Sequence, residues 1–412
     1  MLHQVARRER TIGGALAAGG GYGGGFDSLR LVLALLVMMF HAGATVRSTL
    51  WTDTLTPLTH SLVPLFFGVS GFLVAGSASR LPVGPFLVNR ALRILPALTA
   101  VSLVTALVVG PMVSTYGPAA YFAQPAVWQY GANSIGLFRG QLPGVFTQNG
   151  QPGIVNAALW TLAYELACYG LMAGLISVGL LRRPRLLLAV AVTLAVTPAL
   201  LEALGLLPLF ARNGLFRLVF LGRGAILFAA FLCGCLLYVW RDAVPRDGRL
   251  LAAALAGSGL AHWLGPDRWH LVDPALSGLC LAYIAVWIGV TDFGGRIGPY
   301  KVDYSYGLYL YHCLVLNVVV LLVPQIDSVT SLVLLAIGPT ILVAAVSWHG
   351  IERPSLRARK GLGRIASRTV AALAGTRLGF QRASPLAGYR GGAPMEQGAA
   401  LHPQKVPDLV KP

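Results

Sequence analysis

Apolar runs long enough to cross a bilayer recur along this chain, and they constrain its fold more than any other feature. The first of them reads FDSLRLVLALLVMMFHAG, from Phe26 to Gly43. A helix needs about 20 consecutive apolar residues to cross the hydrocarbon core of a membrane. Of the 412 residues, 56% are hydrophobic and only 11% are charged. The sequence therefore predicts an all-α, polytopic integral membrane protein.

The pattern predicts about ten transmembrane helices, and the charges between them indicate an orientation. The predicted spans are 29–46, 58–77, 94–113, 156–180, 186–206, 219–240, 249–264, 274–290, 304–323 and 330–350. Basic residues gather in the loops that follow the even-numbered spans and are sparse in the other loops. Because cytoplasmic loops are rich in Lys and Arg, we expect both termini to be cytoplasmic. The net charge of +17 fits this pattern better than it fits a nucleic-acid surface.

Three regions follow from this count. Residues 1–25 are Gly-rich with three arginines and predict a flexible cytoplasmic tail. Residues 26–354 form the transmembrane domain, and the basic residues 355–412 predict a largely disordered cytoplasmic tail that is attracted to anionic lipid. The long loop at 114–155 would be periplasmic, as a lid over an acceptor or as an inert connector. All five cysteines fall in apolar runs, so we infer neither a disulfide nor a metal site.

Two polar residues in the first span lie eleven positions apart. On a helix this spacing places Arg30 and His41 on one face, about 16 Å from each other. At the cytoplasmic mouth, Arg30 can bind a phosphate or extend to lipid headgroups. Well inside the membrane, His41 is either a functional group or a hydrogen-bonded packing residue.

A second basic pair and an acidic residue lie in later spans. Arg90 and Arg93 share a helical face, which suits phosphate binding by forked hydrogen bonds but also fits a positive-inside signal. Glu165 lies at a depth similar to that of His41 and shares a face with Tyr169. It can orient a histidine or form a structural pair with the phenol.

Small and polar residues mark two further spans. The run VPLFFGVSGFLVAG contains Ser70 among glycines, which allow close helix packing or a narrow substrate passage. In the ninth span, Ser305, Tyr309 and His312 follow one helical face.

Six segments, in this order, resemble the acyltransferase 3 family of membrane O-acyltransferases: FDSLRLVLALLVMMFHAG, VPLFFGVSGFLVAG, NRALRILP, LWTLAYELACY, YSYGLYLYH and IERP. The resemblance covers about residues 26–354. It implies transfer of an acyl group, acetyl above all, from acyl-CoA to a hydroxyl of a cell-surface or lipid-linked carbohydrate, as in O-acetylation of lipopolysaccharide or exopolysaccharide. It also implies a multi-pass protein of the cell inner membrane, with acyl-CoA as co-substrate and no bound cofactor or metal.

On this resemblance each candidate residue receives an expected role. Acyl-CoA phosphates would be bound by Arg30, Arg90 and Arg93. His41 would be the catalytic base or an acyl relay, and Glu165 would be a second catalytic residue that orients His41 or stabilises its imidazolium. The remaining candidates would line the donor or acceptor channel: Ser70, Tyr169, Ser305, Tyr309 and His312.

Two other classes of protein also place charged groups inside a membrane. A transporter or flippase for a polar lipid-linked sugar would use them as binding or relay groups. It would be expected to contain inverted repeats, and we find none in the sequence. The other class is a non-catalytic subunit of a polysaccharide-export complex, for which no dependence on acyl-CoA is expected.

Overall fold

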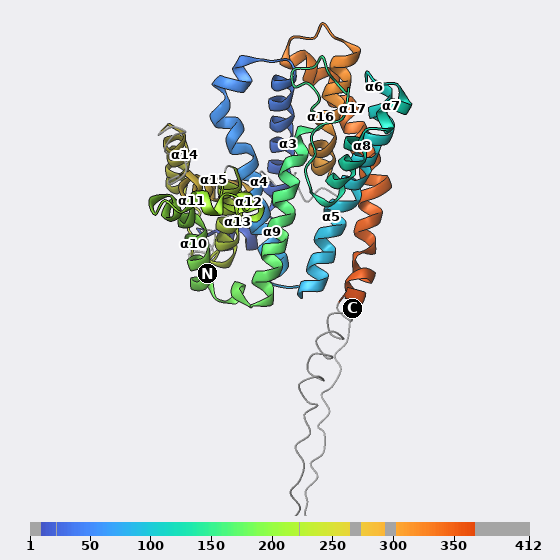
Figure 1. The fold of residues 1–412 in the computed structure, drawn as a ribbon. Coiled ribbons are helices and arrows are strands. Elements are labelled where there is room, and N and C mark those ends of the chain that lie inside the picture. The colour runs from blue at the N-terminus through green and yellow to red at the C-terminus, as the bar shows by residue number, and fades with distance from the viewer. Residues whose placement is uncertain (1–9, 22, 222, 264–272, 293–301, 367–412) are drawn as a thin grey trace, which may run out of the picture. The chain divides into compact units, whose positions relative to one another are not determined.

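The computed structural model describes residues 10–21, 23–221, 223–263, 273–292 and 302–366. Across these residues the regular structure is helical, and the only β-type pairing is three isolated bridges. The prediction of an all-α membrane protein is confirmed. Figure 1 shows the helices in chain order.

Among the described residues, seven helices are long and apolar enough to cross a membrane. They are α3 (Gly24–Thr45), α4 (Thr56–Ala78), α5 (Val83–Val104), α9 (Trp160–Ser177), α10 (Pro184–Ala203), α16 (Ser305–Leu322) and α17 (Val329–Ser347). The last of these continues through the π-helical turn η7 (Trp348–Glu352) to residue 366. Similarly, α5 continues through η2 (Thr105–Val109) and α6 (Gly110–Val113).

The other predicted spans are shorter or bent. A bent pair, α12 (Gly214–Phe220) and α13 (Arg223–Val239), would be the eighth span if its two helices cross together. In place of the seventh and eighth predicted spans the structure has α14 (Gly248–Trp263) and α15 (Asp273–Gly289), of 16 and 17 residues. The short helix α11 (Leu207–Phe210) follows α10. The count of ten crossings therefore stays a prediction.

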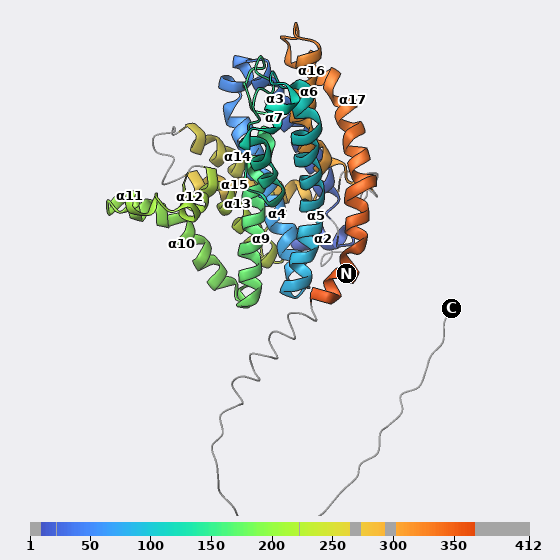
Figure 2. The same cartoon turned by 45° about the vertical axis from the view of Figure 1, so that its right-hand side comes forward.

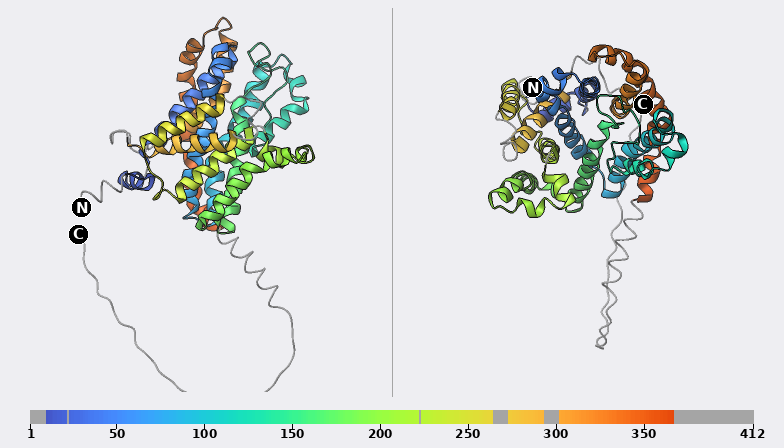
Figure 3. Two further views of the ribbon diagram at one scale, coloured as in Figure 1. Left: turned by 90° about the vertical axis from the view of Figure 1, so that its left-hand side faces the viewer. Right: turned by 45° about the horizontal axis from the view of Figure 1, so that its top comes forward.

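Helix α3 occupies the middle of the arrangement. It packs against α4, α15, α16 and α17. Figure 2 shows α17 on the opposite side of the helices from α10 and α13, and the second view in Figure 3 agrees. The residues of α3 therefore face neighbours from both halves of the chain.

Close approach of α4, α13 and α15 depends on glycine. A Cβ atom at Gly71 would overlap the backbone carbonyl of Phe231 in α13, and a Cβ at Gly68 would come within 2.8 Å of the Ala282 Cα in α15. The run VPLFFGVSGFLVAG is compatible with either close helix packing or a narrow substrate passage. At Gly68 and Gly71 the structure shows close packing. Small residues allow helix backbones in membranes to approach each other in this way.

Residues 114–155, here called the cap, are folded. They contain α7 (Pro118–Phe122), α8 (Pro125–Gln129) and the 3₁₀ turn η3 (Tyr130–Ile135). The side-chain amide of Asn149 donates to Oδ1 of Asn317 in α16 at 2.7 Å, and Gly150 N donates to Thr45 O at the end of α3 at 3.0 Å. These bonds hold the cap against the ends of α3 and α16.

Parts of both predicted tails are also folded, which corrects their boundaries. Helix α2 (Ile12–Ala18) lies within the predicted flexible segment 1–25, and Ile12 is fully buried. Its backbone is held by Ile12 N donating to Val244 O at 3.0 Å. At the other end, helical structure continues through residues 353–366, so the predicted tail does not begin at 355. The Gly-rich composition of the first segment and the many basic residues of the second concealed these helices. The remainder of that tail, residues 367–412, lies outside the described residues.

We expect Gly71→Ala to destabilise the protein, by about 1–3 kcal/mol as is typical of overpacking, because the added methyl group meets backbone rather than a movable side chain. Thermal unfolding of the purified variant measures this. Gly170→Ala in α9 is the matched control, since its Cβ would have no neighbour within 4 Å. Equal melting temperatures for the two variants would contradict the packing described for α4 and α13.

Candidate active site

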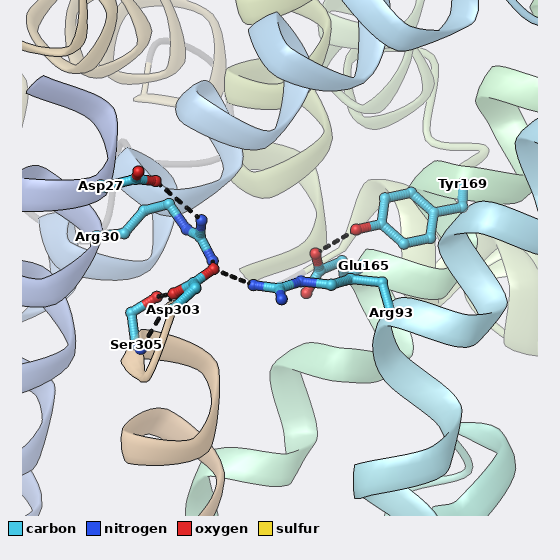
Figure 4. A network of polar contacts seen from close by, with 7 residues as sticks. All are labelled: Asp27, Arg30, Arg93, Glu165, Tyr169, Asp303 and Ser305. Atoms are coloured by element: carbon cyan, nitrogen blue, oxygen red, sulfur yellow. Dashed lines mark hydrogen bonds and ion pairs between the residues drawn. The ribbon is translucent and has the colours of Figure 1, made fainter. Parts of the chain in front are cut away.

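Asp303, just before α16, bridges two of the predicted arginines (Figure 4). Arg30 Nη2 in α3 lies 2.9 Å from Asp303 Oδ2, and Arg93 in α5 forms an ion pair and a hydrogen bond with the same oxygen. The other carboxylate oxygen accepts from the Ser305 hydroxyl at 2.6 Å. Asp27 lies 3.7 Å from Arg30, one helical turn away. This cluster joins three helices that are distant in sequence.

The charge state of Asp303 follows from this environment. Burial alone would raise the pKa of the Asp303 carboxyl, but the Arg30 and Arg93 guanidiniums outweigh it and hold that pKa well below its usual range. The carboxylate is therefore ionised at neutral pH. Sequence reasoning missed this residue, although it stands two positions before Ser305, at the start of a predicted span. A carboxylate at a helix start is easily interpreted as a cap rather than as a bridge between helices.

Next to this cluster is a cavity of about 150 Å³. Eight of the ten predicted site residues line it: Arg30, Ser70, Arg90, Arg93, Glu165, Tyr169, Ser305 and Tyr309. Its other walls are largely apolar and come mainly from α4, including Val63, Phe66 and Leu73. The structure thus brings the three predicted cationic residues and four of the five predicted channel-lining residues together around one space, which we call the arginine cavity; the fifth, His312, lies outside its lining.

Arg90 differs from the other two arginines. Its guanidinium lies over the Tyr169 ring, with Cζ 5.8 Å from the ring centroid. Its Nε is buried without a hydrogen-bond partner, and among the described residues it forms no ion pair. Arg90 also lies inside α5, which begins at Val83, eleven residues before the predicted start of that span. An apolar-run criterion placed the start too late because it excluded these charged residues.

Of the two partners considered for Glu165, the structure shows Tyr169. Glu165 Oε1 accepts a hydrogen bond from Tyr169 Oη at 2.6 Å, so the structural pair is present. The side chain that contacts His41 is His312, with His312 Nε2 3.0 Å from His41 Nδ1. In this structure the Glu165 carboxylate is held by the phenol, and its role toward His41 stays a prediction. Similar depth in the membrane did not reveal which neighbour each side chain faces.

The two histidines lie beyond the arginine cavity. Tyr309, which lines the cavity, has its ring 6.0 Å from that of His312 in an edge-on arrangement. The Tyr309 hydroxyl is within 2.7 Å of Thr161 Oγ1, on the cavity wall. Tyr309 therefore contacts both the arginine cavity and the ring of His312.

A second, much smaller pocket reaches His41 beneath the cap. It has a volume of about 10 Å³ and is lined by His41, Thr45, Gln151, Ile154, Ala157, Cys313 and Asn317. This is space for about one water molecule. His41 therefore lies between the arginine cavity on one side and a polar pocket under the cap on the other.

One group of side chains has the composition of a metal site. The nearest donor atoms of His41, His312 and Cys313 all lie within 4.8 Å of one another, and all three residues are buried. However, both imidazoles also contact backbone carbonyls: His41 Nδ1 lies 3.0 Å from Val37 O, and His312 Nδ1 lies 3.0 Å from Leu308 O. Hydrogen bonding thus accounts for these positions of the rings.

Comparisons with known proteins agree with the geometry. A family model described as an acyltransferase domain matches residues 24–349. Nodulation protein 10 of Rhizobium leguminosarum bv. viciae is 29% identical over 365 residues, which are 83% of this chain and 95% of that protein. An O-acetyl transferase of Shigella phage Sf6 is 25% identical over 337 residues, 80% of this chain and 94% of that protein. No solved structure matches significantly. Because the family model covers most of the chain, the protein belongs to the acyltransferase 3 family and is a multi-pass membrane O-acyltransferase.

Proposed function

We propose that this enzyme transfers an acyl group, acetyl in the first instance, from acyl-CoA to a hydroxyl of a cell-surface or lipid-linked carbohydrate. The observation that carries the proposal is the arginine cavity, in which Arg30, Arg90 and Arg93 meet beside apolar walls. Acyl-CoA combines several phosphates with a long, less polar arm that ends in a thioester. Guanidinium groups bind phosphates by charge-assisted hydrogen bonds, and the arm then extends past Tyr309 toward His41.

The acceptor approaches from the other side of His41. A sugar hydroxyl is too weak an acid to attack a thioester unaided, so a positioned base accelerates the reaction. His41 takes the hydroxyl proton while the sugar oxygen bonds to the acyl carbon. The C–S bond then breaks, and the leaving CoA thiolate takes that proton from the imidazolium. The small pocket beneath the cap is the route by which the hydroxyl reaches His41.

This assignment also gives the protein a direction in the membrane. CoA thioesters are made in the cytoplasm. If the protein lies in the cell inner membrane, the end of the bundle with Arg30 and Asp303 therefore lies at the cytoplasmic face of that membrane. The cap then faces the opposite side, where surface carbohydrates are completed. A transporter or export subunit uses no acyl donor, and the membership of an acyltransferase family favours the enzyme over both.

The direct test incubates purified protein with labelled acetyl-CoA and extracted cell-envelope glycans. We expect label in the glycan fraction, and His41→Ala to lower the rate by about 10²–10⁴-fold, the usual contribution of a general base. Label that remains in acetyl-CoA or free acetate, or sugar movement without acyl transfer, would overturn the proposal. A His41→Ala variant with the wild-type rate would show that His41 is not the catalytic base.

Arg90 is the arginine best placed to bind a donor phosphate, because among the described residues no carboxylate is paired with it. We expect Arg90→Gln to raise the KM for acetyl-CoA by about 10- to 100-fold, the loss of one charge-assisted hydrogen bond in a partly buried site, with little change in kcat. Steady-state kinetics at varied donor concentration measure this. Arg80→Gln is the matched control, since Arg80 is exposed in the turn after α4. Equal KM values for the two variants would contradict the role of Arg90.

The pKa of the Asp303 carboxyl is lower in the folded protein than its ordinary value, so its ionisation contributes to the free energy of unfolding. A carboxyl whose pKa is lower in the folded protein stabilises the fold above its unfolded pKa of about 3.9 and loses that effect as the pH falls below it. We expect Asp303→Asn to lower stability at pH 7, by about 1.5–3 kcal/mol, the range for hydrogen bonds to charged groups, because these side chains are partly buried. The difference from wild type should shrink below about pH 4. Thermal unfolding at pH 7 and at a pH below about 4 tests this. The exposed Asp327→Asn is the control. A deficit of the same size at both pH values would show that the carboxylate charge is not responsible.

A further inference from the structure

The contact between His41 and His312 joins the proposed base to a second buried imidazole. His41 belongs to α3 and His312 to α16, and the two side chains are 9% and 0% exposed. His312 Nε2 lies 3.0 Å from His41 Nδ1, and the ring centroids are 5.0 Å apart. Such a contact between neutral imidazoles requires a particular arrangement of protons.

The backbone contacts determine that arrangement. A carbonyl oxygen only accepts, so His312 Nδ1, 3.0 Å from Leu308 O, carries a proton. The Nε2 atom of a neutral His312 is then an acceptor. His41 Nδ1 lies 3.0 Å from Val37 O and 3.0 Å from His312 Nε2, and both of these atoms accept. His41 Nδ1 therefore carries one proton, which is shared between the Val37 carbonyl and His312 Nε2 in a bifurcated hydrogen bond, and His41 Nε2 is left with its lone pair.

We propose that His312 is a positioning residue that holds His41 in the tautomer protonated at Nδ1, so that Nε2 is the basic atom. This inference rests on the proposed function, in which His41 is the base. It assigns His312 a role different from that of a channel-lining residue. A neutral acceptor against Nδ1–H orients the ring, and it also stabilises the imidazolium that forms when Nε2 takes the hydroxyl proton. In many functional histidines the tautomer is fixed by the hydrogen-bond partner of one ring nitrogen.

The surroundings of His312 suit a fixed acceptor. Its ring is held by the Leu308 carbonyl and packed edge-on against Tyr309, so it cannot turn without breaking both contacts. Cys313 Sγ lies 3.3 Å from the same Nε2. A thiol is a weak donor, so the stronger N–H donor of His41 takes the Nε2 lone pair. Removing the Cys313 thiol should therefore leave the His41 tautomer unchanged.

The test compares His312→Gln with His312→Met. The two side chains have similar length and flexibility, but only Gln carries a carbonyl oxygen that can accept from His41 Nδ1–H. We expect His312→Met to lower kcat by about 10- to 100-fold, as loss of such an orienting partner typically does, with the donor KM unchanged. His312→Gln should recover most of that loss. Rates are normalised to the amount of protein that binds acetyl-CoA, which corrects for any misfolded fraction.

The possible outcomes separate this inference from the function on which it rests. Absence of acyl transfer by the wild-type enzyme would remove the proposed function itself. Wild-type transfer together with equal kcat values for the Gln and Met variants would overturn only the role of His312. A stoichiometric transition metal in the purified wild-type protein, lost in both His312 variants together with activity, would also overturn it, because a metal would then join the imidazoles.

Discussion

One carboxylate holds the cationic part of the site together. Two guanidinium groups repel each other, so Arg30 and Arg93 remain side by side because the Asp303 carboxylate forms an ion pair with each of them. Arg30 lies in the first half of α3, Arg93 lies in α5, and Asp303 lies two residues before the start of α16. The bridge therefore fixes the relative positions of three helices and leaves Arg90, on the same cavity, available for a ligand phosphate.

The same helices carry the proposed chemistry at their other ends. Helix α3 leads from Arg30 to His41, and α16 leads from Ser305 to His312. Since Asp303 ties the starts of α3 and α16 together, it also helps to align the two histidines two to three turns further along. The cap closes the far end through Asn149. An acyl donor anchored at the arginines and a hydroxyl under the cap would then meet at His41 from opposite sides.

Much of this arrangement could be predicted from the sequence, because apolar length and charge position are local properties. The helix that contains both Arg30 and His41 and the pairing of Glu165 with Tyr169 are examples. Contacts between helices were not accessible in the same way. The His41–His312 pair joins residues 271 positions apart, and depth alone favoured Glu165 instead. Asp303 was missed because its two partners lie on other helices. The folding of α2 was missed because Ile12 is buried by long-range contacts.

The measurement that tests the central claim most directly is an experimental structure of the enzyme with a non-hydrolysable thioether analogue of acetyl-CoA. We predict phosphate density against Arg90 and near Arg30 and Arg93, the arm running past Tyr309, and the acyl carbon facing Nε2 of His41. Phosphates bound under the cap, or an acyl end directed away from His41 into the bilayer, would contradict it.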